Sequence, residues 1–214
     1  MMESRPGPMC NRVTPRGDIV AIELRGAWLG NRGILHRDTD VLWFHRSNLW
    51  IICALQHKDW RLPQWAAHHF TVLFFHDEAV ALAAGHRPCA LCRRDAYNDY
   101  RRAWAAGLDT AVPLAKAIDH QLHGERIVRG THRRRLHPME WHTVPAGAFV
   151  QVAGQPALAL HDVVVPWTVD GYAEAMARPG SGIVDVITPP SSVAALRAGY
   201  EPQIDPARRR GRSA

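Results

Sequence analysis

Residues 70–94 read FTVLFFHDEAVALAAGHRPCALCRR, and this stretch decides the fold of the chain. It begins inside 69–75, a run of aromatic and β-branched residues that is typical of a buried strand. Asp77 is a favoured helix N-cap and Gly85 a favoured residue just after a helix, so a short helix is predicted between them. The stretch then reaches Pro88-Cys89-Ala90-Leu91-Cys92, a C-x-x-C motif that we expect at the start of a second helix.

The C-x-x-C motif predicts a zinc site. Two cysteines three residues apart on a tight turn can direct both sulfurs at one ion, and zinc usually takes four ligands. Cys53, on a predicted buried strand over 49–56, is the third candidate, and His57 is the fourth if the strand ends and turns after Cys53. His69, His76, His86, His120 and His123 remain alternatives for that fourth position. Two core thiols or a redox pair would be the other interpretations of Cys89 and Cys92, but no thioredoxin-like βαβ unit surrounds them.

Composition places the chain among soluble globular proteins. It has 214 residues, 47% of them hydrophobic and 21% charged, which is enough for one core or two small ones. No apolar run approaches the roughly 20 residues of a membrane span, and no apolar segment resembles a secretory signal. We therefore expect a cytoplasmic protein with no membrane partner. A disulfide framework is not expected there, and Cys10 is read as a bystander.

The stretch over residues 70–94 resembles the zinc-binding N-terminal domain of the Ada family of bacterial alkylation-repair proteins. The matching positions are Phe74, Glu78, Ala79, Ala84, Gly85, Arg87, Pro88, Cys89 and Cys92. This resemblance implies zinc binding by the two cysteines and an association with DNA. In that family an upstream C-x-x-x-C supplies the other ligands, and its first cysteine accepts a methyl group from a DNA phosphotriester. The corresponding segment here is Cys53-Ala-Leu-Gln-His57, with histidine replacing the second cysteine. The family's helix-turn-helix regulator and its Pro-Cys-His-Arg transferase motif are missing, so a separate bacterial group that shares the zinc module is expected.

Outward from this stretch, the pattern predicts an α+β fold in which a small zinc-organised sheet with helices is followed by a β-rich C-terminal segment. Further strands are predicted over 18–24, 149–152, 157–160, 163–165 and 183–187, and the glycine-rich segment 25–33 is expected to be a turn. The second helix is expected to end at Gly107, a third to run from near Pro113 to residue 126, and a short one to cover 190–198. The expected divisions are a disordered leader (1–17), an Ada-like zinc domain (18–126), a basic linker (127–145), a β-rich segment (146–204) and a basic tail (205–214).

The charge balance favours an anionic partner. The formal net charge is +6, and Lys58 and Lys116 are the only lysines, so almost all positive charge is arginine. A GC-rich genome could account for arginine over lysine, but it would not account for the positive balance. Guanidinium groups suit phosphate, and Trp60 and Trp65 could stack on bases. The predicted nucleic-acid contacts are Arg87, Arg93, Arg94, Arg101, Arg133, Arg134 and Arg135. The main hypothesis is a zinc-containing nucleic-acid-binding protein, with DNA favoured, that serves DNA repair or processing.

Two other function classes remain open. A zinc deaminase needs H-x-E before P-C-x-x-C, and His57-Lys58-Asp59 would supply the first half with aspartate in place of the catalytic glutamate. Asp119 and His123 lie one helical turn apart and are the candidate catalytic pair of such a hydrolase-like or deaminase-like enzyme. The third class is a zinc-stabilised protein-interaction module. The oligomeric state is not indicated by the sequence.

Overall fold

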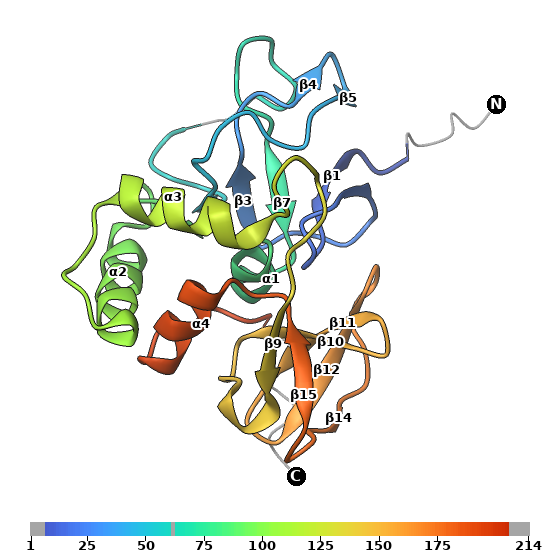
Figure 1. Ribbon diagram of the computed structural model, residues 1–214. Coiled ribbons are helices and arrows are strands. Elements are labelled where there is room, and N and C mark those ends of the chain that lie inside the picture. The colour runs from blue at the N-terminus through green and yellow to red at the C-terminus, as the bar shows by residue number, and fades with distance from the viewer. Residues whose placement is uncertain (1–6, 61–62, 206–214) are drawn as a thin grey trace.

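The computed structural model describes residues 7–60 and 63–205, which form a mixed α+β structure (Figure 1). This confirms the predicted fold class. Two sheets lie at opposite ends of the molecule in this view, with helix α1 between them and helices α2, α3 and α4 along one side. None of the helices in the described ranges has the length and apolar character needed to cross a bilayer.

The first sheet has six strands in the order β2-β1-β7-β3-β6-β8. Their bounds are β1 Cys10–Val13, β2 Ile19–Ala21, β3 Trp28–Asn31, β6 Ile51–Cys53, β7 Leu73–Phe75 and β8 Arg87–Pro88. Strand β3 is antiparallel to both of its neighbours, whereas β1 with β7 and β6 with β8 are parallel pairs. A small two-stranded sheet of β4 His36–Arg37 and β5 Asp40–Val41 lies beyond β3 (Figure 1).

The second sheet has seven antiparallel strands and contains most of the C-terminal part of the chain. Six follow the order β13-β12-β11-β10-β15-β9, and β14 pairs with β12. The bounds are β9 His137–Glu140, β10 Phe149–Val152, β11 Gln155–Ala159, β12 Val163–Thr168, β13 Gly171–Tyr172, β14 Met176–Ala177 and β15 Ile183–Val186. The predicted β-rich segment therefore exists, and β9 from the predicted linker forms one edge of its sheet.

The helices follow the local signals closely. Helix α1 covers Glu78–Ala83, the Asp77 carboxylate accepts from the Val80 N–H at 2.9 Å, and Gly85 follows with φ of 82°. The other helices are α2 Arg94–Leu108, α3 Ala115–Arg126 and α4 Pro190–Arg197. Helix α2 begins after the cysteines rather than at Pro88, because Arg87 and Pro88 pair with β6 and the next residues form a turn. The expected placement of Cys89 and Cys92 on a helix was therefore wrong.

Segment 25–33 was expected to be a turn, but it contains β3, a central strand of the first sheet. The reason lies in packing that is remote in sequence. The Phe75 ring lies across Gly30, where an added Cβ would be 2.4 Å from a ring carbon. Gly30 is thus a strand residue without a side chain because an aromatic ring occupies that space.

The predicted leader and linker are also corrected. Within the leader, β1 pairs with both β2 and β7, and Val13 is buried; residues 1–6 lie outside the described ranges. Segment 127–145 contains β9 and the 3-10 turn Trp141–Thr143, so it is part of the fold and not a linker. One hydrophobic cluster includes residues of both sheets, which makes the described chain a single folded unit. Of the predicted tail, Asp205 pairs with His76 at 2.9 Å, and 206–214 are outside the described ranges.

Candidate metal centre

The centre lies at one edge of the first sheet, where two parallel strands end together. Strand β6 pairs with β8 in the register Ile51 to Arg87 and Ile52 to Pro88. The next residues in this register are Cys53 and Cys89, and the Cys89 N–H continues the ladder by donating to the Ile52 carbonyl at 2.9 Å. Strand pairing therefore brings together two cysteines that are far apart in the sequence.

The third sulfur comes from the turn that precedes α2. The Arg93 N–H donates to the Cys89 carbonyl at 3.2 Å, which folds Cys92 back over the strand ends. The sulfur atoms of Cys53, Cys89 and Cys92 lie within 4.8 Å of one another, so the group could hold a metal ion. Sulfurs at about 2.3 Å from a shared tetrahedral ion are about 3.8 Å apart, a separation that lies inside this limit. The predicted convergence of the three cysteines is confirmed.

Backbone and thiol hydrogen bonds favour negative charge at this cluster. The Cys89 sulfur accepts from the Leu91 N–H at 3.4 Å, and the Cys92 sulfur accepts from the Ala54 N–H at 3.4 Å. The thiols of Cys53 and Cys92 lower the pKa of Cys89 by donating to its sulfur, and the same hydrogen bond raises the pKa of Cys53. These hydrogen bonds favour a thiolate at Cys89, and a divalent cation would displace the protons of the neighbouring thiols.

Every cysteine and histidine of the chain lies in the described ranges, and only the three cysteines gather there. His57 is not in the group: its ring packs edge-on against Trp60, with centroids 5.4 Å apart. Asp59, the glutamate substitute of the deaminase hypothesis, is exposed and is also outside the group. His57 as the fourth ligand remains a prediction, and it requires this loop to turn toward the sulfurs.

The catalytic pair Asp119 and His123 does not form. Both carboxylate oxygens of Asp119 accept from Arg87 at 2.8 Å, and both side chains are buried. His123 instead accepts at Nδ1 from Arg126 at 3.0 Å. Asp119 therefore anchors α3 to β8 through Arg87, which lies two residues before Cys89. The same ion pair removes Arg87 from the predicted nucleic-acid contacts.

Two further predicted contacts are also structural. Arg93 donates to Glu78 at 2.9 Å and stacks on Trp28 at 3.8 Å, and both members of the ion pair are buried. Arg134 donates to the carbonyls of Ile187 and Arg126, at 2.7 and 2.8 Å, and is only partly exposed. The remaining candidates stay at the surface: Arg94, Arg133 and Arg135 are exposed, and Arg101 lies half-buried against Tyr97.

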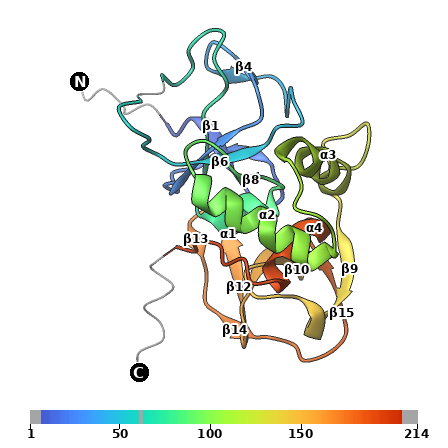
Figure 2. The same ribbon diagram turned by 90° about the vertical axis from the view of Figure 1, so that its left-hand side faces the viewer.

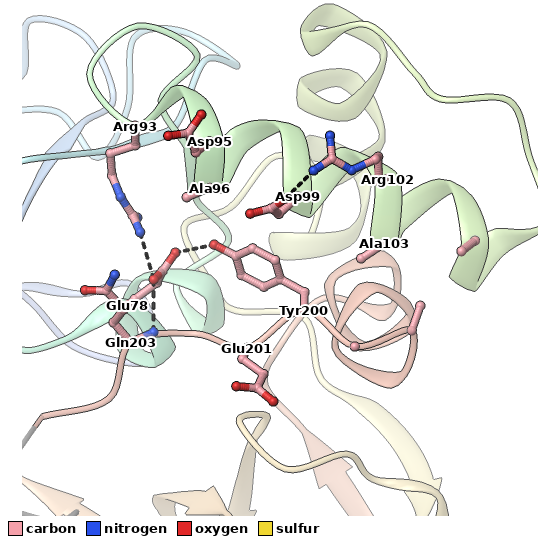
Figure 3. A pocket seen from close by; sticks show the side chains of 13 residues that line it. Glu78, Arg93, Asp95, Ala96, Asp99, Arg102, Ala103, Tyr200, Glu201 and Gln203 are labelled. Carbon is pink, nitrogen blue, oxygen red and sulfur yellow. Dashed lines mark hydrogen bonds and ion pairs between the residues drawn. The ribbon is translucent and has the colours of Figure 1, made fainter.

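A cavity of about 730 Å³ opens between α2 and the segment that follows α4 (Figure 3). At its base, the Glu78 carboxylate accepts from Arg93 at 2.9 Å, from the Tyr200 hydroxyl at 2.5 Å and from the Gln203 N–H at 3.0 Å. Burial, and then the Glu78 charge, raise the pKa of Tyr200. Asp95, Asp99, Arg102 and Glu201 also line the cavity. This cluster was not predicted from the sequence, because a buried glutamate with partners 15 to 125 residues away leaves no local signal.

Comparisons of the chain with protein-family models, with curated proteins and with solved structures found no match. Its function is therefore inferred from its own residues. The three sulfur atoms at the sheet edge and the arginines at the surface are the features that bear on it most directly.

Proposed function

We propose that this chain is a zinc protein that binds nucleic acid, with DNA favoured, and that it serves DNA repair or processing. The observation that carries the proposal is the convergence of Cys53, Cys89 and Cys92 within 4.8 Å. Three thiols from three different segments have one chemistry in common, which is the binding of a soft or borderline divalent cation.

Zinc is the metal that this donor set favours. Thiolate sulfur selects zinc over magnesium or calcium, which prefer oxygen ligands. Structural zinc has four protein ligands, and His57, four residues after Cys53, is the proposed fourth. The ion would join the end of β6, the end of β8 and the turn before α2 (Figure 2).

The nucleic-acid part of the proposal follows from what the ion would hold in place. Arg94 is exposed and lies two residues after Cys92, and Arg101 is two helical turns further along α2 on the same face. A metal that fixes the start of α2 would hold these guanidinium groups in a constant register for phosphates. Trp60, 56% exposed in the loop after β6, offers a ring for base stacking. The net charge of +6 and the resemblance to the Ada zinc domain support DNA as the partner.

The first test is metal content. Protein purified without chelator is expected to contain one zinc per chain by elemental analysis, and Cys89→Ser and Cys92→Ser variants are expected to lose it. A Cys10→Ser variant is the matched control, because Cys10 lies in β1 and outside the group. A wild-type protein free of metal would overturn the proposal.

The second test is the salt dependence of DNA binding. Anisotropy of a labelled oligonucleotide should report an affinity that falls as the salt concentration rises, and Arg94→Gln with Arg101→Gln should reduce the slope of log K against log salt by about 2. Arg102→Gln is the control on the same helix, since Arg102 is exposed and already paired with Asp99. Binding that is independent of salt, or an equal effect of the control, would refute the phosphate contacts.

A second candidate is a zinc enzyme, and the three-cysteine donor set itself favours it. Catalytic zinc characteristically has three protein ligands and an exchangeable water, whose pKa the ion lowers. Cobalt substitution distinguishes the candidates. If His57→Ala changes the cobalt spectrum, the site is the closed structural one; if an added thiol ligand changes the spectrum and His57→Ala does not, the enzyme is favoured.

A further inference from the structure

Two buried arginines pack against one tryptophan at the opposite end of the strands from the cysteines. Arg32 and Arg126 are both 0% exposed, and their guanidinium carbons lie 4.0 and 3.8 Å from the centroid of the Trp50 ring. The two positive groups are thus no more than about 8 Å apart. Phe44 lies 4.8 Å from the Arg32 guanidinium carbon, so aromatic rings surround that group.

No carboxylate neutralises this pair within the described ranges. Neither Arg32 nor Arg126 forms an ion pair there, and Arg126 and Arg134 are the largest electrostatic influences on Arg32, both repulsive. Asp18 attracts Arg32 and Asp119 attracts Arg126, but neither carboxylate is within ion-pair distance of these arginines. Asp18 interacts with Thr14, Asp119 with Arg87, and Glu125 with Ser191.

Several polar atoms of the same group have no hydrogen-bond partner among the described residues. They are Arg32 Nη2, Arg126 Nε and His86 Nδ1, all inaccessible to solvent. Arg32 donates from Nε to His86 Nε2 at 3.1 Å and from Nη1 to the Gly17 carbonyl, and Arg126 donates to the carbonyls of Gly85 and Asn48. Buried polar atoms are normally paired, so orphaned donors beside uncompensated charge indicate that a partner is missing.

Deprotonation does not resolve the imbalance, because a guanidinium group stays charged in proteins. Cation–π contacts and carbonyl dipoles offset only part of the charge. A counter-ion from solvent would offset the remaining positive charge. Three histidines, His45, His123 and His132, lie next to this group.

These histidines line the outer side of the arginine pair. His123 accepts from Arg126 Nη2 at 3.0 Å, and the rings of His45 and His123 are 5.1 Å apart. His132 is exposed and lies 5.1 Å from the Phe44 ring. Burial, and then the charge of Arg126, lower the pKa of His123 to about 4, so a bound anion would also allow this imidazole to take up a proton.

We propose that His45, His123 and His132 form a binding site for a phosphate group, with Arg126 and Arg32 behind them as fixed positive charges. This site is distinct from the metal centre and uses neither Arg94 nor Arg101. Trp50 immediately precedes β6 and His86 immediately precedes β8, whereas Cys53 and Cys89 stand at the other ends of these strands. The site and the metal centre are thus separated by a span of about three strand residues, or about 10 Å.

The test uses inorganic phosphate, with chloride at equal ionic strength as the comparison. Titration calorimetry should show saturable phosphate binding, and the thermal midpoint should rise with phosphate and not with chloride. His123 is half-buried, so His123→Asn leaves the core intact. This variant should bind phosphate about tenfold more weakly, as expected for the loss of a charge-assisted hydrogen bond. Arg102→Gln is the control and should bind phosphate as the wild type does.

Arg32→Gln separates a ligand site from a purely structural arginine. If the buried charge is stabilised by a bound anion, this variant should have a higher thermal midpoint than the wild type in chloride. Its thermal midpoint should then no longer rise with phosphate. If Arg32 is only structural, the variant should melt lower by the same amount in both buffers. The second result, or an absence of saturable phosphate binding by the wild type, would overturn the proposal.

The source of the phosphate is decided by oligonucleotides with and without a 5′-phosphate. A preference for the 5′-phosphate that His123→Asn removes, and that Arg94→Gln with Arg101→Gln retains, would assign the site to a nucleic-acid end. Binding of inorganic phosphate alone would assign it to a small phosphorylated ligand. Both results support the site, and since the α2 variants do not touch it, failure of the DNA-binding proposal would be seen separately.

Discussion

The buried ion pair between Arg87 and Asp119 gives a prediction about stability that also tests the role of Asp119. The side chains are 2% and 9% exposed, and two hydrogen bonds of 2.8 Å join them. Asp119→Ala leaves the Arg87 guanidinium buried without its counter-charge, which costs about 3–5 kcal/mol. At about 2–4 °C per kcal/mol for a chain of this size, we expect the melting temperature to fall by roughly 10 °C.

The assay is urea unfolding of the protein as purified, at neutral pH, analysed as a double-mutant cycle of Arg87→Met, Asp119→Leu and their combination. Arg87→Met combined with Asp119→Leu removes both charges and keeps apolar volume, so it should cost far less than Asp119→Ala alone. An Asp119→Ala variant within about 1 kcal/mol of wild type would refute the reasoning, because a buried pair of this geometry cannot be broken at so small a cost. A double variant as unstable as the sum of the single ones would refute it too.

Three other features of the fold give predictions of their own. Gly30→Ala should destabilise the protein by about 1–3 kcal/mol in urea unfolding, because the new Cβ meets the Phe75 ring at 2.4 Å; unchanged stability would contradict the packing of β3. Asp77→Ala should cost at least about 1 kcal/mol in the same assay, and Asp77→Asn less, since asparagine also caps helices. The pKa of His123 is lowered to about 4, so the folded state binds fewer protons than the unfolded state between that pH and about 6.5. Stability should therefore fall as the pH drops through this window, and His123→Asn should flatten the fall in a series of melts in chloride; an unchanged slope would exclude His123 as its source.

Local signals explain what the sequence analysis predicted correctly. The helix between Asp77 and Gly85 rests on a cap and a positive-φ glycine, both of which act within one helical turn. The convergence of Cys53 with Cys89 was predicted from thiol chemistry alone. Strand pairing between β6 and β8 then supplied the geometry.

Partners that are remote in the sequence explain the features that the sequence did not predict. Arg87 and Arg93 look like surface cations in a basic run, and only the fold shows that Asp119 and Glu78 meet them inside the protein. In the sequence Gly30 looks like a turn residue. The reason for a glycine there is the Phe75 ring, which fills its side-chain space and comes from a strand more than forty residues later. Signals of this kind belong to tertiary contacts, and a single sequence does not display them.

The parallel pair of β6 and β8 has a consequence for how the protein would respond to its environment. The sulfur group holds one end of this pair, while Trp50 and His86, beside the buried arginines, stand at the other. If an occupant at either end tightens the alignment of these two short strands, thermodynamic reciprocity requires each occupant to strengthen the other by the same factor. The strength of metal retention would then depend on the anion in the buffer. Resistance to a chelator would therefore report whether an anion is bound at the other end of the two strands.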